Sequence, residues 1–191
     1  PRGDLDRPGG RAHPERLVSR AVLSIGSNIG DRTAHLRSVT EALADRIVAV
    51  SPVYSTAPWG GVEQQDFLNA VVVAEDPSLD CRGWLDLGRQ LEAAADRVRE
   101  QRWGPRSLDV DVVTCHDSDG REVLSDDPEL TLPHPRAHLR AFVLVPWWDV
   151  EPQATLVVDG TRRPLTEWLA ALAVDEREGV RRTEYRLEPP R

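Results

Sequence analysis

The sequence predicts an α+β protein with a ferredoxin-like βαββαβ core, in which a mainly antiparallel sheet carries helices packed on one face. Short apolar, β-rich runs alternate with two longer helical segments in the order strand, helix, strand, strand, helix, strand. The chain has 191 residues, of which 40% are hydrophobic and 29% charged. This composition is typical of one folded domain rather than of a disordered or membrane-embedded chain.

Local signals define each element of the core. The first strand ends at the small-residue turn Gly26-Ser27-Asn28, and Asp31 is a suitable N-cap for the helix that follows. Pro52 interrupts the second strand, which we expect to be an edge or bulged strand. The expected strands are 20–25, 47–56, 67–74 and 108–115, and the expected core helices are 31–45 and 79–98.

Both ends of the chain differ from the core in composition. Residues 1–19 are rich in Pro, Gly and Arg and predict a flexible N-terminal arm, and 177–191 predict a polar C-terminal tail. The folded domain is expected over 20–176. Its C-terminal additions are two short helices, near 135–145 and 164–172.

Charge and hydropathy exclude several classes of function. The net charge of −8 argues against a nucleic-acid-binding protein, and no apolar run approaches the ~18–20 residues that a spanning helix needs. All 24 basic residues are arginine, so lysine Schiff bases and P-loop lysines are excluded. Arginine and backbone groups must therefore do any phosphate binding. We expect a monomer.

Two cysteines give a prediction about the compartment. Cys81 and Cys115 are too few for a disulfide framework or a zinc site, and we expect both to be small buried hydrophobic residues. Together with the lack of a secretory segment, this predicts a cytoplasmic protein.

The most specific local pattern is a pair of carboxylates on the last core strand. Asp109 and Asp111 stand at i and i+2, so they project from one face, while Leu108, Val110 and Val112 point into the core. Two carboxylates ~7 Å apart on a rigid strand suit hard divalent cations, and Mg²⁺ above all, because it takes few protein carboxylates and completes its shell with water and phosphate oxygens. An exposed acidic strand face is the alternative interpretation.

Arginines precede this pair in the sequence. Arg97, Arg99, Arg102 and Arg106 lie within ten residues of one another, and Gly-Pro at 104–105 ends the helix and allows a mobile loop. Guanidinium groups beside a metal-binding carboxylate pair are what phosphoryl transfer requires.

Several further segments complete a pattern that resembles a known family. Residues 56–61 and 66–69 bracket a loop that offers an aromatic face, an amide and exposed backbone, which suits a flat heteroaromatic ligand. The chain resembles the 6-hydroxymethyl-7,8-dihydropterin pyrophosphokinases over about residues 20–150. The motifs that carry the resemblance are Gly26-Ser27-Asn28, Thr56-x-Pro58, Phe67-Leu68-Asn69, Arg97-x-Arg99, Arg102-Trp103-Gly104-Pro105-Arg106, Leu108-Asp109-x-Asp111, and Pro133-His134 through Arg140-x-Phe142.

This resemblance implies a reaction and a set of site residues. The reaction is pyrophosphate transfer from ATP to 6-hydroxymethyl-7,8-dihydropterin in folate biosynthesis, with release of AMP, using two magnesium ions bound with ATP and mobile arginine loops. The resemblance assigns Asp109 and Asp111 to the metals and, with Arg97 and Arg106, to catalysis. The implied pterin-binding residues are Thr56, Ala57, Pro58, Trp59, Phe67, Asn69 and Phe142. The implied ATP-binding residues are Glu92, Arg99, Trp103, Arg106, Val112, Thr131, His134 and Arg140. Arg89 and Glu129 stand where relatives carry other nucleotide contacts.

Two other functions fit part of the pattern. A nucleotidyltransferase also combines a Gly-Ser turn with an Asp-x-Asp pair, but that family places the two motifs close together, whereas Ser27 lies far from Asp109 here. It would release pyrophosphate instead of AMP. A non-catalytic ferredoxin-like binding module would bind ATP without needing magnesium.

Overall fold

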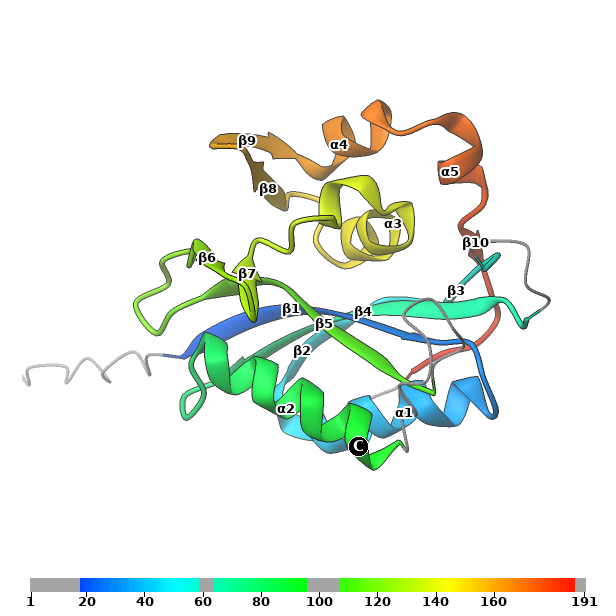
Figure 1. The fold of residues 1–191 in the computed structure, drawn as a ribbon, viewed down its shortest axis with the longest axis horizontal. Coiled ribbons are helices and arrows are strands. Elements are labelled where there is room, and N and C mark those ends of the chain that lie inside the picture. The colour runs from blue at the N-terminus through cyan, green and yellow to red at the C-terminus, as the bar shows by residue number, and fades with distance from the viewer. Residues whose placement is uncertain (1–17, 59–63, 96–106, 188–191) are drawn as a thin grey trace, which may run out of the picture.

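An antiparallel sheet forms the centre of the computed structural model, which describes residues 18–58, 64–95 and 107–187 (Figure 1). Its strand order is β10-β3-β4-β1-β5, and β2 also pairs with β4. The core strands therefore have the order and antiparallel pairing of a ferredoxin-like sheet, so the predicted fold class is confirmed. The strands of this sheet are β1 (Ser19–Ser27), β2 (Ile47–Val50), β3 (Tyr54–Thr56), β4 (Phe67–Asp76), β5 (Asp109–His116) and β10 (Arg181–Arg182).

Two helices cover the lower face of the sheet in Figure 1. They are α1 (Arg32–Leu43), which leads into a short 3-10 turn at Ala44–Arg46, and α2 (Cys81–Ala94). Asp31 caps α1 by accepting a hydrogen bond from the Ala34 N–H, as the sequence predicts, and Asp80 caps α2 in the same way through Gly83. Trp84 of α2 is fully buried against the sheet and donates from Nε1 to Ser19 Oγ over 2.9 Å.

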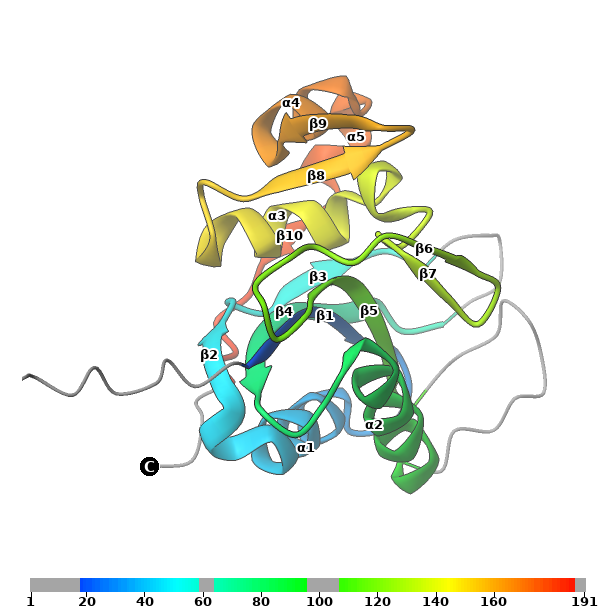
Figure 2. The ribbon, with the colours of Figure 1, turned by 90° about the vertical axis from the view of Figure 1, so that its left-hand side faces the viewer.

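The two core helices lie on one face of the sheet, as predicted, and an additional C-terminal helix covers the other face. Helix α3 (Ala141–Val150) packs across β4, and α4 (Leu165–Ala171) and the hairpin of β8 (Thr155–Val158) and β9 (Thr161–Pro164) lie on the side of α3 away from the sheet (Figure 2). The sequence carried a signal for this. Residues 70–74 read Ala-Val-Val-Val-Ala without polar alternation, which is typical of a strand buried on both faces.

The interruption predicted at Pro52 separates β2 from β3. Both strands pair with β4, and Ser51 spans the gap between them: its N–H donates to Val71 O over 2.9 Å, and its Oγ accepts from Val71 N over 2.8 Å. Pro52 has no N–H to contribute to the ladder, so the break falls where the chain cannot donate.

The two cysteines are joined, which corrects the expectation that each is an isolated buried thiol. Cys81, the first residue of α2, forms a disulfide with Cys115 of β5, with their Cα atoms 5.8 Å apart. The two residues are 34 positions apart in sequence, and they meet because α2 lies along β5. Composition gave no information on that packing.

The remaining elements follow β5 along the chain. They are β6 (Ser125–Asp127), β7 (Leu130–Leu132), a 3-10 turn at Ala137–Leu139 and α5 (Val174–Glu178). The helix expected near 135–145 is realised as this turn followed by α3, and the helix expected at 164–172 is α4. Residues 1–17 of the predicted arm lie outside the described residues. Part of the predicted C-terminal tail packs on the sheet, since β10 pairs with β3 and Leu187 is buried. Within the described ranges, no helix is long and apolar enough to cross a membrane.

Candidate active site

One row across the sheet holds three of the residues that define the candidate site. Asn69 on β4 pairs with Gly26 on β1, and Gly26 pairs with Asp109 on β5. Side chains directly opposite each other on neighbouring strands lie on the same face. A Cβ atom at Gly26 would come within 3.0 Å of Asn69 Oδ1. The glycine therefore keeps the sheet surface open between the amide and the carboxylate.

Asp109 and Asp111 show the alternation predicted for them. Both carboxylates are partly exposed, while Leu108, Val110 and Val112 are buried in the core shared with α2. Asp111 lies opposite Ser24, one row along from the pair formed by Gly26 and Asp109. The two carboxylates thus share one face of β5.

Asp111 lies near charged groups that shift its pKa in opposite directions. Arg140, just before α3, donates from one guanidinium nitrogen to Asp111 Oδ2 over 3.2 Å. Burial, and after it the charge of Asp109, raise the pKa of Asp111 to about 6 against the opposing effect of Arg140. Ionised Asp111 is therefore under-compensated by the protein, and a bound cation would stabilise it.

His134 stands beside the same carboxylate as a neutral ring. Burial lowers the pKa of His134 to about 4, with Arg140 acting in the same direction. His134 Nδ1 accepts from the Arg136 N–H over 3.1 Å, and Nε2 lies 3.8 Å from Asp111 Oδ2. The proton of the neutral imidazole is then on Nε2, directed toward the carboxylate.

Glu92 joins helix α2 to the strand that carries the aspartates. Its side chain is buried, and Oε1 accepts from the Val110 N–H over 2.9 Å. One helical turn earlier, a Cβ atom at Gly88 would come within 3.1 Å of Val110 Cγ1. The glycine allows α2 to approach β5 closely, which brings Glu92 within reach of the strand backbone.

A cavity of about 210 Å³ lies next to Asp111. Its lining includes four residues that the sequence predicted at or near the nucleotide: Asp111, Val112, Thr131 and His134. Leu85 and Leu130 add apolar surface. The structure therefore brings this part of the predicted ATP-binding set together around one hollow.

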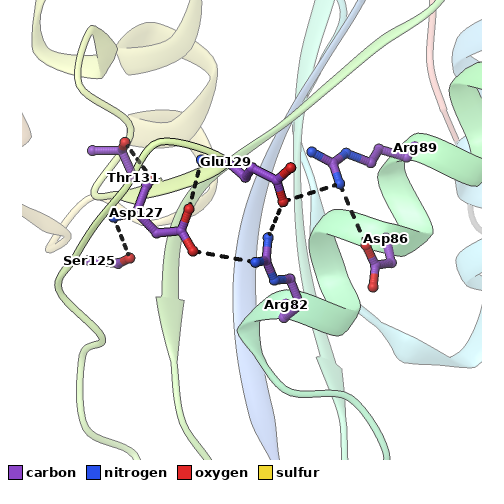
Figure 3. A network of polar contacts seen from close by, with 7 residues as sticks. All are labelled: Arg82, Asp86, Arg89, Ser125, Asp127, Glu129 and Thr131. Carbon is purple, nitrogen blue, oxygen red and sulfur yellow. Dashed lines mark hydrogen bonds and ion pairs between the residues drawn. The ribbon is translucent and has the colours of Figure 1, made fainter.

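The segment containing β6 and β7 forms one wall of this cavity and is fastened to α2 by ion pairs (Figure 3). Arg82 contacts Asp127 at 3.3 Å and Glu129 at 2.9 Å, and Arg89 lies 3.9 Å from Glu129. Thr131 Oγ1 donates to the Asp127 carbonyl over 3.0 Å. Arg82 and Asp127 were not singled out from the sequence, because two charged residues on separate exposed segments carry no periodic signal.

The residues predicted for the pterin lie along β3 and β4 and at the start of α3. Thr56 pairs with Phe67, and Asn69 Nδ2 donates to Thr56 Oγ1 over 2.9 Å. Phe142 is half-buried in the first turn of α3, with the Arg140 guanidinium carbon 5.6 Å from its ring centroid. Arg140 thus contacts both the Asp111 carboxylate and the Phe142 ring. Ala57 and Pro58 follow β3 at the surface.

Five predicted site residues lie outside the described residues: Trp59, Arg97, Arg99, Trp103 and Arg106. The turn at Gly26-Ser27-Asn28 makes contacts within the protein, since Ser27 Oγ lies 3.2 Å from His35 Nδ1 and Asn28 Nδ2 donates to Gln64 over 2.8 Å.

A larger cavity of about 520 Å³ lies elsewhere, lined by residues such as Arg20, His116 and Trp147. None of the predicted site residues lines it. The smaller cavity is the relevant one, because Asp111 and the His134 imidazole line it.

Comparison with known proteins identifies the family. The sequence profile of the 7,8-dihydro-6-hydroxymethylpterin-pyrophosphokinase family (HPPK) matches residues 22–152. The chain belongs to the HPPK family. A 2-amino-4-hydroxy-6-hydroxymethyldihydropteridine pyrophosphokinase of Mycobacterium tuberculosis H37Rv is 53% identical over 168 residues, covering 86% of this chain and 89% of the relative. The protein of that name from Mycobacterium leprae is 52% identical over 176 residues, covering 90% and 92%.

A solved HPPK structure shares the fold. The HPPK-DHPS protein of Plasmodium falciparum superposes with a TM-score of 0.58 at 12% identity, covering 83% of this chain and 41% of that one. The HPPK match covers the whole candidate site, from Gly26 to Phe142.

Proposed function

We propose that this HPPK-family protein performs its chemistry at the face of β5 that carries Asp109 and Asp111. The protein is an ATP-dependent pyrophosphokinase of folate biosynthesis, which transfers the pyrophosphoryl group of ATP to 6-hydroxymethyl-7,8-dihydropterin. The observation that carries the assignment of the site is the row Asn69–Gly26–Asp109, because it sets an amide able to hydrogen-bond a pterin on the same sheet face as the first aspartate of the pair, two strands away.

The donor set of this site fits magnesium. Two carboxylates lie on one face of a strand, and the pKa of Asp111 is raised by burial and by Asp109, which is the condition that a divalent cation would relieve. Within the described residues, no group of three or more metal-binding side chains occurs. We propose that Asp109 and Asp111 hold two magnesium ions with ATP; when bound, these ions neutralise phosphate charge.

The proposed transfer makes one bond and breaks one, and it consumes no cofactor. The pterin hydroxyl oxygen forms a bond to the β-phosphorus of ATP, the bond from that phosphorus to the bridging α,β-oxygen breaks, AMP leaves with the bridging oxygen, and the hydroxyl proton passes to solvent. The described residues include no side chain suited to be a strong general base near the site, since His134 has a pKa of about 4 and both aspartates are assigned to metal. Positioning and charge stabilisation therefore account for the catalysis.

The remaining side chains have binding and orienting tasks in this proposal. Arg140 holds Asp111 in place and provides positive charge close to the phosphates. Phe67 and Phe142 stack on the pterin, and Asn69 binds its edge, with Thr56, Ala57, Pro58 and Trp59 completing the pocket. The cavity lined by Val112, Thr131 and His134 takes the nucleotide, and Glu92 holds the backbone of Val110, which also lines it. Catalytic roles for Arg97 and Arg106, and nucleotide contacts by Arg99 and Trp103, stay predictions.

The experiment that tests this function is product analysis. The purified protein is incubated with ATP, MgCl₂ and hydroxymethyl-dihydropterin, and the products are separated by chromatography. AMP and pterin diphosphate are expected in equal amounts. Release of pyrophosphate instead would indicate the nucleotidyltransferase, and ATP binding that is independent of magnesium and gives no product would indicate a binding module. A monomeric state, a cytoplasmic location and the arm, domain and tail boundaries (1–19, 20–176 and 177–191) stay predictions.

A further inference from the structure

The C-terminal residues 181–187 form a strap along the free edge of β3. Arg181 and Arg182 pair with Ser55 and Tyr54 as strand β10. Thr183 then donates twice to the Val53 carbonyl, from its N–H over 2.9 Å and from Oγ1 over 2.8 Å. Leu187 ends the strap in the hydrophobic core, with 5% of its surface exposed. The strap lies beyond residues 22–152, which match the family.

One contact of the strap reaches the residue that precedes Phe67. A guanidinium nitrogen of Arg181 lies 3.3 Å from Asp66 Oδ2, and Ser55 Oγ donates to the same oxygen over 3.2 Å. From α1, Arg32 donates to the Asp66 carbonyl over 2.7 Å. Groups on β10, β3 and α1 therefore hold Asp66 at the point where the chain enters β4.

A second contact of the strap reaches the helix that carries Phe142. Arg182 lies 3.8 Å from Asp149 Oδ2 on α3, and the Tyr54 hydroxyl donates to that same oxygen. The strap thus touches both supports of the expected pterin pocket: the entry to β4, which carries Phe67, and α3, which carries Phe142 near its start. Figure 1 shows β10 beside β3 and below α5.

We propose that Asp66 and Arg181 are positioning residues that fix the Phe67 ring and thereby set the affinity for the pterin. This proposal rests on the proposed function of Phe67. Neither side chain needs to touch a substrate, because the backbone at Asp66 is continuous with Phe67. Both groups are partly exposed, and exposed ion pairs contribute little to global stability. Their loss should therefore change ring placement without unfolding the protein.

The test compares steady-state kinetics of Asp66→Asn and Arg181→Gln with wild type. Asp66→Asn weakens two contacts and Arg181→Gln weakens one, so KM for hydroxymethyl-dihydropterin should rise about 2- to 5-fold, the scale set by an exposed ion pair of up to about 1 kcal/mol. KM for ATP should not change. The double variant should show no further loss beyond Asp66→Asn, because both single changes remove the same contact. Arg181→Lys should retain most of the affinity.

The matched control is Arg186→Gln, which removes an exposed arginine from the same strap. Melting temperatures of all variants check that the fold is intact, and quenching of pterin fluorescence on binding reports stacking directly. Wild-type protein that makes no AMP would refute the proposed function itself. If wild type is active, a pterin KM in Asp66→Asn and Arg181→Gln no higher than in Arg186→Gln overturns the positioning role, as does an equal rise in KM for ATP.

Discussion

Replacing Asp111 with asparagine should make the magnesium-free protein more stable while nearly abolishing turnover. The substitution keeps the shape of the side chain and its ability to accept from Arg140, and removes only the charge. Neutralising Asp111 removes a charge that the folded protein compensates incompletely, as its pKa of about 6 indicates.

The size of the gain follows from that pKa. The carboxyl of Asp111 has an ordinary pKa of 3.8 and a folded-state pKa of about 6. At 1.36 kcal/mol per unit this corresponds to about 3 kcal/mol, an upper value. The side chain is 34% exposed, and solvent screening reduces the expected gain to roughly 1–2 kcal/mol.

The gain in stability from Asp111→Asn should be present at high pH and absent at low pH. Between about pH 4 and pH 6 the folded state holds the Asp111 proton more tightly than the unfolded state, so the stability of the wild-type protein falls as pH rises through this window. Asparagine does not titrate. The variant should therefore be more stable than wild type at pH 8 and equal to it below pH 4.

Urea unfolding of chelator-treated protein at both pH values measures this difference, with Asp126→Asn on exposed β6 as the control. AMP formation in the presence of magnesium is measured on the same samples, with Asp109→Asn alongside. A gain of equal size at both pH values, or no gain at pH 8, would refute the electrostatic reasoning. Near-normal turnover in either variant would remove that aspartate from the metal site.

Four other changes test separate parts of the structure. Phe67→Ala or Phe142→Ala should weaken pterin binding by roughly 1–3 kcal/mol in titration calorimetry, since each removes a stacking ring, with ATP affinity little changed. Gly26→Ala places a Cβ atom 3.0 Å from Asn69 Oδ1 and should weaken pterin binding in the same assay; unchanged affinity would show that the open row is not needed. Glu92→Ala leaves the Val110 N–H without its acceptor and should cost about 1–3 kcal/mol in urea unfolding, whereas Glu92→Gln, which keeps an acceptor, should cost much less. Reducing the Cys81–Cys115 disulfide should lower stability by about 2–4 kcal/mol, and reductant should have no effect on Cys115→Ala.

Patterns that repeat along the chain predicted the core, and contacts between distant segments escaped prediction. The alternation of Asp109 and Asp111 with Leu108, Val110 and Val112 gave both the strand and its polar face, because side chains on a strand alternate regardless of what lies around it. The N-cap at Asp31 and the strand break at Pro52 were also predictable, because each depends on residues nearby in the sequence. The disulfide depends on how α2 lies over β5, which no local pattern reports.

The candidate site was predictable to the extent that its motifs are local. The role of Asp111 followed from its local motif, but its contact with Arg140 depends on where α3 packs, and no local pattern placed that helix on the sheet. The sequence marked Gly26 only as part of a turn. Its importance is that it has no side chain between Asn69 and Asp109, which lie on the neighbouring strands. The ion pairs from Arg82 to the β6–β7 segment were invisible for the same reason.

The row from Asn69 through Gly26 to Asp109 spans three neighbouring strands, so the spacing between strands fixes the separation of its two ends. Two such spacings amount to about 10 Å, and backbone hydrogen bonds on both sides of β1 make this width stiff. Changes in the surrounding loops cannot stretch it. On the proposed assignment, this fixed separation sets how far the hydroxymethyl arm has to reach from the pterin ring to the β-phosphorus. A pterin alcohol with an arm one carbon longer would be held by the same ring contacts and still present its oxygen at the wrong distance.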